Sequence, residues 1–231
     1  MGGKRFLRMG VAGLAIVLAP GVDASFVWGS DASGYLTDSR SSAVGEGVTA
    51  TQQWADGGFV IDWEISFSFA RGQWTYKYTI EVTDKELSHF ILEVTNDAQP
   101  FSILGGTSTP IEGPTTYSGA DPSNPQMPNP VYGVKFNFGS GRVTYTIVTD
   151  RAPVWGVFYT KDGKTDGEDV VAWSNALNYG DYQRNASLTV NDFIVRPDGN
   201  RVVPLPAAVW LLGAGFLGYL GIGYSRRKDD A

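Results

Sequence analysis

Apolar and polar side chains alternate in two neighbouring stretches of the chain, residues 58–69 and 73–83. The first places an apolar residue at every second position beginning with Phe59, and the second does so beginning with Trp74. A period of two is typical of a strand that buries one face. Because Arg71 and Gly72 supply a tight turn between the stretches, the pattern predicts an antiparallel hairpin.

Shorter segments with strand character follow at residues 88–95, 131–138, 142–149, 154–160 and 187–195. Turn-forming residues separate them at 139–141, 162–164 and 197–199. Residues 25–200 show no long helical periodicity, so we expect an all-β domain there, a single antiparallel β-sandwich of jelly-roll or immunoglobulin-like type. The proline-rich residues 121–130 are expected to form an extended loop within this domain.

The first residues of the chain carry three basic side chains: Lys4, Arg5 and Arg8. A short apolar run over residues 9–18 and a small residue at Ala24 follow. This order is typical of a secretory signal peptide, so we expect residues 1–24 to be removed by signal peptidase between Ala24 and Ser25. The alternative is a short membrane anchor, but the apolar run is too short to span a bilayer.

A second apolar run lies near the other end, where residues 202–225 contain no charged side chain. As a helix, residues 207–224 would extend about 27 Å, close to the roughly 30 Å of hydrocarbon in a bilayer. Pro204 and Pro206 are expected to lie just outside this helix, because proline interrupts helical hydrogen bonding. Three basic residues follow and are expected to stay cytoplasmic: Arg226, Arg227 and Lys228.

The C-terminal residues contain three sequence elements in a fixed order, and this order is more specific than the apolar run alone. Residues 201–231 contain the motif Val203, Pro204, Leu205, Pro206 and Ala207, then a glycine-rich apolar segment, then the basic cluster. This tail resembles the PEP-CTERM class of sorting signals in its Val-Pro-Leu-Pro-Ala variant, in which Leu205 stands where the usual motif has glutamate. A plain C-terminal anchor is the alternative, and it leaves the two prolines unexplained.

The resemblance implies a Gram-negative source and processing by an exosortase, a membrane-embedded enzyme that recognises and removes such tails. It also implies export across the inner membrane, a transient C-terminal anchor and a final place at the cell surface or outside the cell. The phrases ELSHFILEV and TDRAPVWGVFYTKDG are similar to exported, uncharacterised PEP-CTERM ectodomains. They imply no activity.

Charge and composition narrow the classes of partner. The net charge is −6, and the stretch from Ser25 to Val203 holds 12 basic and 21 acidic residues. An acidic domain without a basic patch argues against nucleic-acid binding. The chain has no cysteine, which excludes disulfides, thiol nucleophiles and thiolate metal sites.

Few residues offer catalytic or metal-binding chemistry. The one histidine, His89, is expected at the surface or at a strand end, and its neighbour Ser88 would point to the opposite face. Carboxylates at Asp62, Glu64 and Glu81 fit either a glycosidase pair or an ordinary solvent face. The acidic residues 162–169 are interpreted as a hairpin loop, with Ca²⁺ binding as the alternative, and no other cofactor is expected.

Aromatic residues in or near the expected loops are candidates for stacking on sugar rings or for core packing: Trp54, Trp155, Trp173, Tyr179 and Tyr182. Trp155 and Trp173 are the chosen glycan-contacting candidates. We expect a non-enzymatic envelope or matrix protein with a structural or adhesive role linked to exopolysaccharide or biofilm. The alternatives are a carbohydrate-binding module and, less favoured, an envelope glycan hydrolase.

Overall fold

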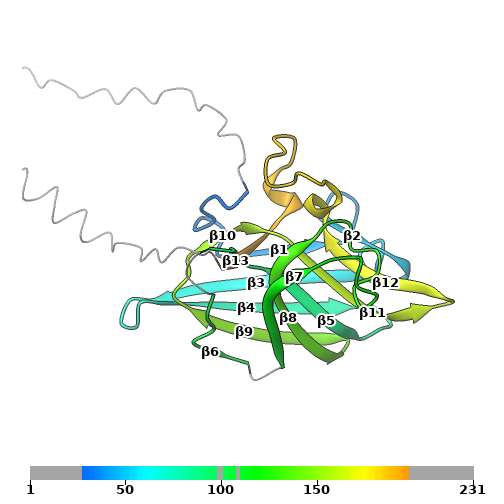
Figure 1. Ribbon diagram of the computed structural model, residues 1–231. Coiled ribbons are helices and arrows are strands. Elements are labelled where there is room, and N and C mark those ends of the chain that lie inside the picture. Colours follow the sequence, from blue (N-terminus) through cyan, green and yellow to red (C-terminus); the bar gives the residue numbers. More distant parts are fainter. Residues whose placement is uncertain (1–27, 98–100, 108–109, 198–231) are drawn as a thin grey trace, which may run out of the picture.

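A computed structural model of the protein describes residues 28–97, 101–107 and 110–197 (Figure 1). The expected signal peptide, its cleavage site at Ala24 and Ser25, the motif from Val203 to Ala207 and the basic cluster from Arg226 to Lys228 lie outside these residues. In the described ranges, the helices that occur are too short or too polar to cross a membrane.

The described residues form an all-β fold whose strands pair in antiparallel fashion. The first sheet has five strands in the order β1 (Thr37–Ser41), β3 (Phe59–Ser68), β4 (Gln73–Val82), β9 (Arg142–Thr149) and β6 (Gly105–Gly106). Its centre is the long hairpin of β3 and β4, which pair from Phe59 opposite Val82 to Ser68 opposite Gln73. The predicted hairpin is therefore confirmed.

The second sheet has six strands in the order β2 (Val48–Ala50), β12 (Glu168–Ser174), β11 (Phe158–Thr165), β5 (Leu87–Glu93), β8 (Val131–Ser140) and β7 (Ile111–Tyr117). A separate pair joins β10 (Pro153–Gly156) to β13 (Ile194–Pro197). Short 3₁₀ turns lie at Gln52–Trp54, Asn175–Asn178 and Val190–Asp192.

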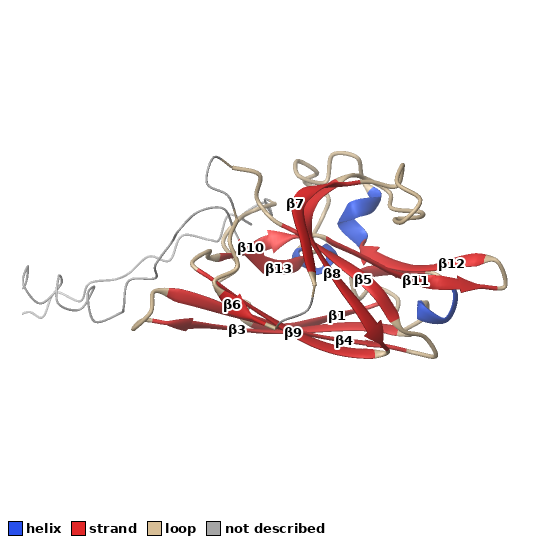
Figure 2. Ribbon diagram, turned by 60° about the horizontal axis from the view of Figure 1, so that its bottom comes forward, coloured by secondary structure: helices blue, strands red, loops and turns tan. Residues whose placement is uncertain are grey.

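The two sheets lie in two layers, as Figure 2 shows, and the fold is β-sandwich-like. Aromatic rings fill the space between the layers. Phe158 of the six-stranded sheet stacks on Phe59 of the five-stranded sheet at 5.5 Å and on Phe90 at 5.4 Å. Tyr145 lies 4.7 Å from Phe136 across the same interface. Burying such large rings removes much apolar area from water, which stabilises a domain without disulfides.

Several strand predictions are confirmed and two are corrected. Residues 88–95, 131–138 and 142–149 correspond to β5, β8 and β9. The segment 154–160 is divided between β10 and β11, which belong to different sheets. The strand expected at 187–195 is wrong for most of its length, because Thr189 and Asp192 form a capping box around a 3₁₀ turn.

Two of the expected turns also differ. The bend at 139–141 is a corner at which the chain passes from β8 in one sheet to β9 in the other. Residues 162–164 lie inside β11, and the chain reverses at Asp166 and Gly167, both with positive φ. Consecutive positive φ values are those of a tight hairpin turn, for which Asp-Gly is a preferred sequence.

Loops cover the outer side of the six-stranded sheet. Residues 118–130 connect β7 to β8, and the backbone carbonyl of Pro125 accepts a hydrogen bond from the Tyr159 hydroxyl at 2.6 Å. The expected loop at 121–130 is thus confirmed as a loop, although it folds in successive turns rather than running extended. Asn129 joins this loop to the 3₁₀ turn at Asn175–Asn178 by donating to the carbonyl of Leu177 at 2.8 Å.

Candidate functional site

The carboxylates expected on a solvent face do lie on the outer face of the five-stranded sheet. Asp62 pairs in register with Thr79, and Glu64 with Lys77. The Lys77 ammonium contacts the Glu64 carboxylate at 3.0 Å, and Glu81 forms an ion pair with Arg142. These charges are exposed, so each pair contributes at most about 1 kcal/mol of stability.

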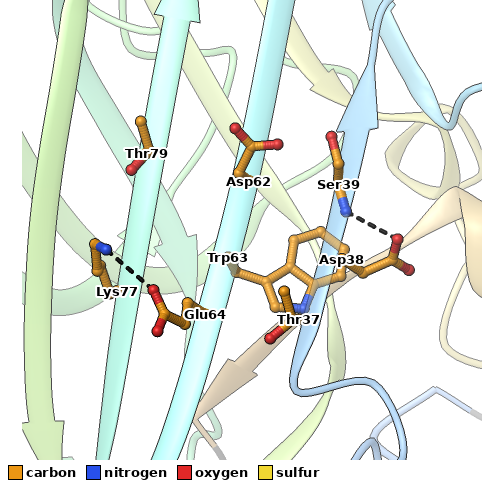
Figure 3. Close-up of a pocket in the computed structure, with 8 residues that line it drawn as sticks. All are labelled: Thr37, Asp38, Ser39, Asp62, Trp63, Glu64, Lys77 and Thr79. Carbon is orange, nitrogen blue, oxygen red and sulfur yellow. Dashed lines mark hydrogen bonds and ion pairs between the residues drawn. The ribbon is translucent and has the colours of Figure 1, made fainter.

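A shallow hollow of about 460 Å³ lies on this face (Figure 3). Its lining is mostly hydroxyl and charged side chains from β1, β3 and β4: Thr37, Asp38, Ser39, Asp62, Trp63, Glu64, Lys77 and Thr79. Glycoside hydrolysis needs a carboxylic acid held in a water-excluding environment beside the scissile bond. An exposed sheet face with its Glu64 already paired to lysine does not provide that environment.

The two glycan-contacting candidates are core residues. Trp155 is 2% exposed and Trp173 is 7% exposed. Tyr35 packs edge-on against the Trp155 ring at 4.9 Å, and the Trp173 indole donates to Asn178 at 2.7 Å. The assignment of Trp155 and Trp173 as glycan-contacting residues is therefore wrong, because neither ring offers a face to a ligand.

The other three aromatic candidates divide. Trp54 and Tyr182 are also buried, whereas Tyr179 is 47% exposed. Tyr182 has a polar role that the sequence did not suggest, because its hydroxyl donates to the carboxylate of Glu93 at 3.2 Å.

His89 was expected at the surface or at a strand end; it lies near the start of β5 and is buried, so the surface position is wrong. It lies within β5 on the side away from the five-stranded sheet, beneath residues 118–130, while Ser88 is exposed. Burial lowers the pKa of His89 to about 4, helped by the nearby charges of Lys135 and Lys161 and partly opposed by the Asn124 side chain and Glu112. The imidazole is therefore neutral at pH 7.

The acidic residues 162–169 form the tip of the β11–β12 hairpin, where the Lys164 ammonium lies 3.5 Å from an Asp169 oxygen. The hairpin is confirmed, although its turn is confined to Asp166 and Gly167 and the flanking residues belong to β11 and β12. Across the described ranges, histidines and carboxylates nowhere gather in groups of three or more that would hold a metal ion.

The residue that sequence reasoning missed is Glu93, at the end of β5. Its side chain is buried, and its two oxygens accept hydrogen bonds from three donors. Oε2 accepts from the Trp28 indole at 3.2 Å and from the backbone N–H of Val157 at 2.9 Å, and Oε1 accepts from Tyr182. The Arg196 guanidinium lies 3.4 Å from Oε2 as its counter-ion.

Arg196 on β13 is fixed by its surroundings. Its Nη1 donates to the Thr95 hydroxyl at 2.8 Å and to the carbonyl of Pro197 at 2.9 Å, and its guanidinium stacks over the Trp28 ring at 5.3 Å. The side chain lies across Gly156, where an added Cβ would come within 2.2 Å of Nε. Only glycine at that position leaves room for the arginine.

A cleft of about 390 Å³ opens beside this pair, where β5 ends and β8 begins. Glu93 lies in its wall together with three aromatic rings, four neutral polar side chains and two apolar residues: Trp28, Val94, Thr95, Asn96, Thr116, Pro130, Tyr132, Tyr182 and Gln183. A concave site that combines aromatic rings with convergent polar groups is the usual form of a small-molecule site.

Comparisons of the chain with protein-family models, with curated proteins and with solved structures found no match.

A sequence signal for this site does exist. Glu93 interrupts the apolar run of β5, and Arg196 interrupts that of β13. A charged residue inside an apolar strand indicates a buried pair, since an unpaired buried charge is very costly. The sequence pattern does not show that Glu93 pairs with Arg196, because the two residues are far apart in the chain.

Proposed function

We propose that the chain is an exported protein of the cell envelope or extracellular matrix, sorted through its C-terminal tail and acting by structural or adhesive contact rather than by catalysis. The observation that carries the proposal is the order of the tail, with the motif Val203 to Ala207, the uncharged run and the basic cluster at Arg226 to Lys228. The secretory pattern in residues 1–24 supports the same direction of export.

The described domain supports a role in contact and shape. Its core is rich in buried aromatic rings, and the chain crosses between the sheets from β4 to β5 and from β8 to β9. Crossings of this kind are those of jelly-roll and immunoglobulin-like sandwiches, which serve as binding and surface modules. We propose a domain of this type.

The mass of the C-terminal peptide tests the sorting proposal. In Gram-negative cells that contain an exosortase, we expect the mature protein to end near Pro206, and deleting the exosortase should restore the basic end. Replacing Pro204 and Pro206 by alanine should block processing, whereas Pro122→Ala, in the exposed loop between β7 and β8, should leave it intact. A retained basic end in both strains would overturn the proposal and make the tail a permanent anchor.

A further inference from the structure

We propose that the cleft beside Glu93 binds a neutral sugar unit of a polysaccharide. This deepens the adhesive role proposed above, because it names the ligand class and the site. The cleft is distinct from the hollow on the five-stranded sheet, and it holds none of the tryptophans selected from the sequence. Its volume of about 390 Å³ falls within the range of small-molecule sites, roughly 300–1,000 Å³.

The chemistry of the lining favours a sugar. The rings of Trp28 and Tyr132 are partly exposed, and an aromatic face packs well against the C–H groups of a pyranose. The side chains of Asn96, Gln183 and Thr116 are exposed at the same cleft. Amide and hydroxyl groups both donate and accept hydrogen bonds, which suits a ligand whose hydroxyls do the same.

The charge of the cleft favours a neutral ligand. Glu93 is the one ionisable carboxylate in its wall, and Arg196 already neutralises it at 3.4 Å. An anionic sugar would find no free cation among the cleft-lining residues, and the chain as a whole carries a net charge of −6. A cationic ligand would compete with Arg196 for Glu93, which is buried and already accepts from three donors.

Glu93 is a positioning residue in this proposal. By accepting from the Trp28 indole and the Tyr182 hydroxyl, it fixes two of the cleft's aromatic side chains in one orientation before a ligand arrives. A preformed wall lowers the entropic cost of binding, because fewer side chains must be immobilised by the ligand.

Titration calorimetry of the purified full-length chain with cellohexaose, laminarihexaose and mannohexaose tests the proposal, with an alginate hexamer as the charged comparison. We expect at least one neutral oligosaccharide to bind and the alginate hexamer to bind at least tenfold more weakly. The double variant Asn96→Ala/Gln183→Ala should weaken that binding at least tenfold, because it removes two side chains that hydrogen-bond the ligand. Tyr132→Leu should weaken it as well by removing the aromatic face.

Two matched controls use the hollow of Figure 3, where Asp62→Asn and Thr79→Ala should leave the affinity unchanged. Unfolding midpoints of all variants show whether a loss of binding is a loss of folding. Absence of binding to all three neutral probes, or equal effects of the cleft and control variants, would overturn the proposal. Neither result depends on how the tail is processed, so failure here is distinguishable from failure of the sorting proposal.

Discussion

The two sheets of this domain are built from similar strands but differ in what covers them. The five-stranded sheet buries one face and exposes the other, on which Asp62, Glu64 and Lys77 lie in solvent. In the six-stranded sheet both faces of β5 are buried. Phe90 and Leu92 point to the core, while His89, Ile91 and Glu93 lie on the opposite side. His89 and Glu93 are therefore polar groups buried on the covered side of the six-stranded sheet.

Two ion pairs make the difference measurable. Glu64 and Lys77 lie 3.0 Å apart with side chains 66% and 49% exposed, whereas Glu93 and Arg196 lie 3.4 Å apart with side chains 4% and 1% exposed. In water an ion pair is weak, because solvent screens it. In the interior, removing one partner leaves a charge that neither water nor the protein stabilises. Similar distances thus correspond to very different energetic roles.

The largest expected effect is that of Glu93→Gln. We expect it to lower the free energy of unfolding by about 3–5 kcal/mol, because Arg196 keeps a buried charge without its partner. The matched substitution Glu64→Gln on the exposed face should change it by less than about 0.5 kcal/mol. Urea denaturation followed by fluorescence measures both.

A second variant keeps this test decisive if Glu93→Gln fails to fold. The double variant Glu93→Gln/Arg196→Met removes both buried charges and should be more stable than the single variant by at least about 1 kcal/mol. Equal losses for Glu93→Gln and Glu64→Gln would show that the two pairs do not differ as the comparison requires.

A smaller effect is expected from acid, through His89. The unfolded chain keeps the ordinary histidine pKa of about 6.5, whereas burial lowers the pKa in the folded protein to about 4. As pH falls, the unfolded state takes up the proton first, so stability declines between pH 6.5 and 4 by about 3 kcal/mol from this group and then levels off.

Neighbouring charges contribute to the same pH dependence, so a variant is needed to isolate the histidine. Hydrogen bonds from Lys135 and Asn137 lower the pKa of Glu112. Protonating Glu112 on acidification therefore also lowers the stability of the folded protein. In His89→Gln the decline between pH 6.5 and 4, measured by urea denaturation, should be smaller than in the wild type by about 3 kcal/mol. An unchanged decline would mean that His89 is accessible to protons in the folded state.

The smallest expected effect is steric. Gly156→Ala should cost about 1–3 kcal/mol, because the new methyl group would displace the Arg196 side chain that lies across it. Gly105→Ala on β6 of the five-stranded sheet is the matched control. Its Cβ would meet Val148 at an ordinary 3.7 Å, so a change below about 0.5 kcal/mol is expected in thermal unfolding. A harmless Gly156→Ala would show that Arg196 is not held in this position.

The same difference between the sheets decides how far the sequence predicts the structure. The β3–β4 hairpin can be predicted from the sequence because one of its faces is exposed to solvent, so polar and apolar residues alternate. β12 was missed because it is buried on both faces and its apolar residues are consecutive, as in Val170 to Trp173. β7 was missed for the opposite reason, since it is exposed and contains Pro114.

The candidate site was less predictable than the fold. The hydrogen-bond donors of Glu93 lie 64, 65 and 89 residues away. They are Val157 between β10 and β11, Trp28 near the start of the described residues, and Tyr182 in the loop after the 3₁₀ turn at Asn175–Asn178. The local pattern of apolar and polar residues does not indicate which distant residues will contact Glu93. It also left open whether Trp155 and Trp173 stack on sugar rings or pack in the core, and the structure buries both.

Hydrogen exchange of the full-length chain, measured peptide by peptide with and without the oligosaccharide that binds, tests most directly whether the covered sheet carries the functional site. We expect slower exchange on ligand addition in peptides that contain residues 93–96, 130–132 and 182–183, and no change in residues 60–68 and 75–81. Slower exchange confined to the exposed face of the five-stranded sheet, or no change at the cleft, would contradict this expectation.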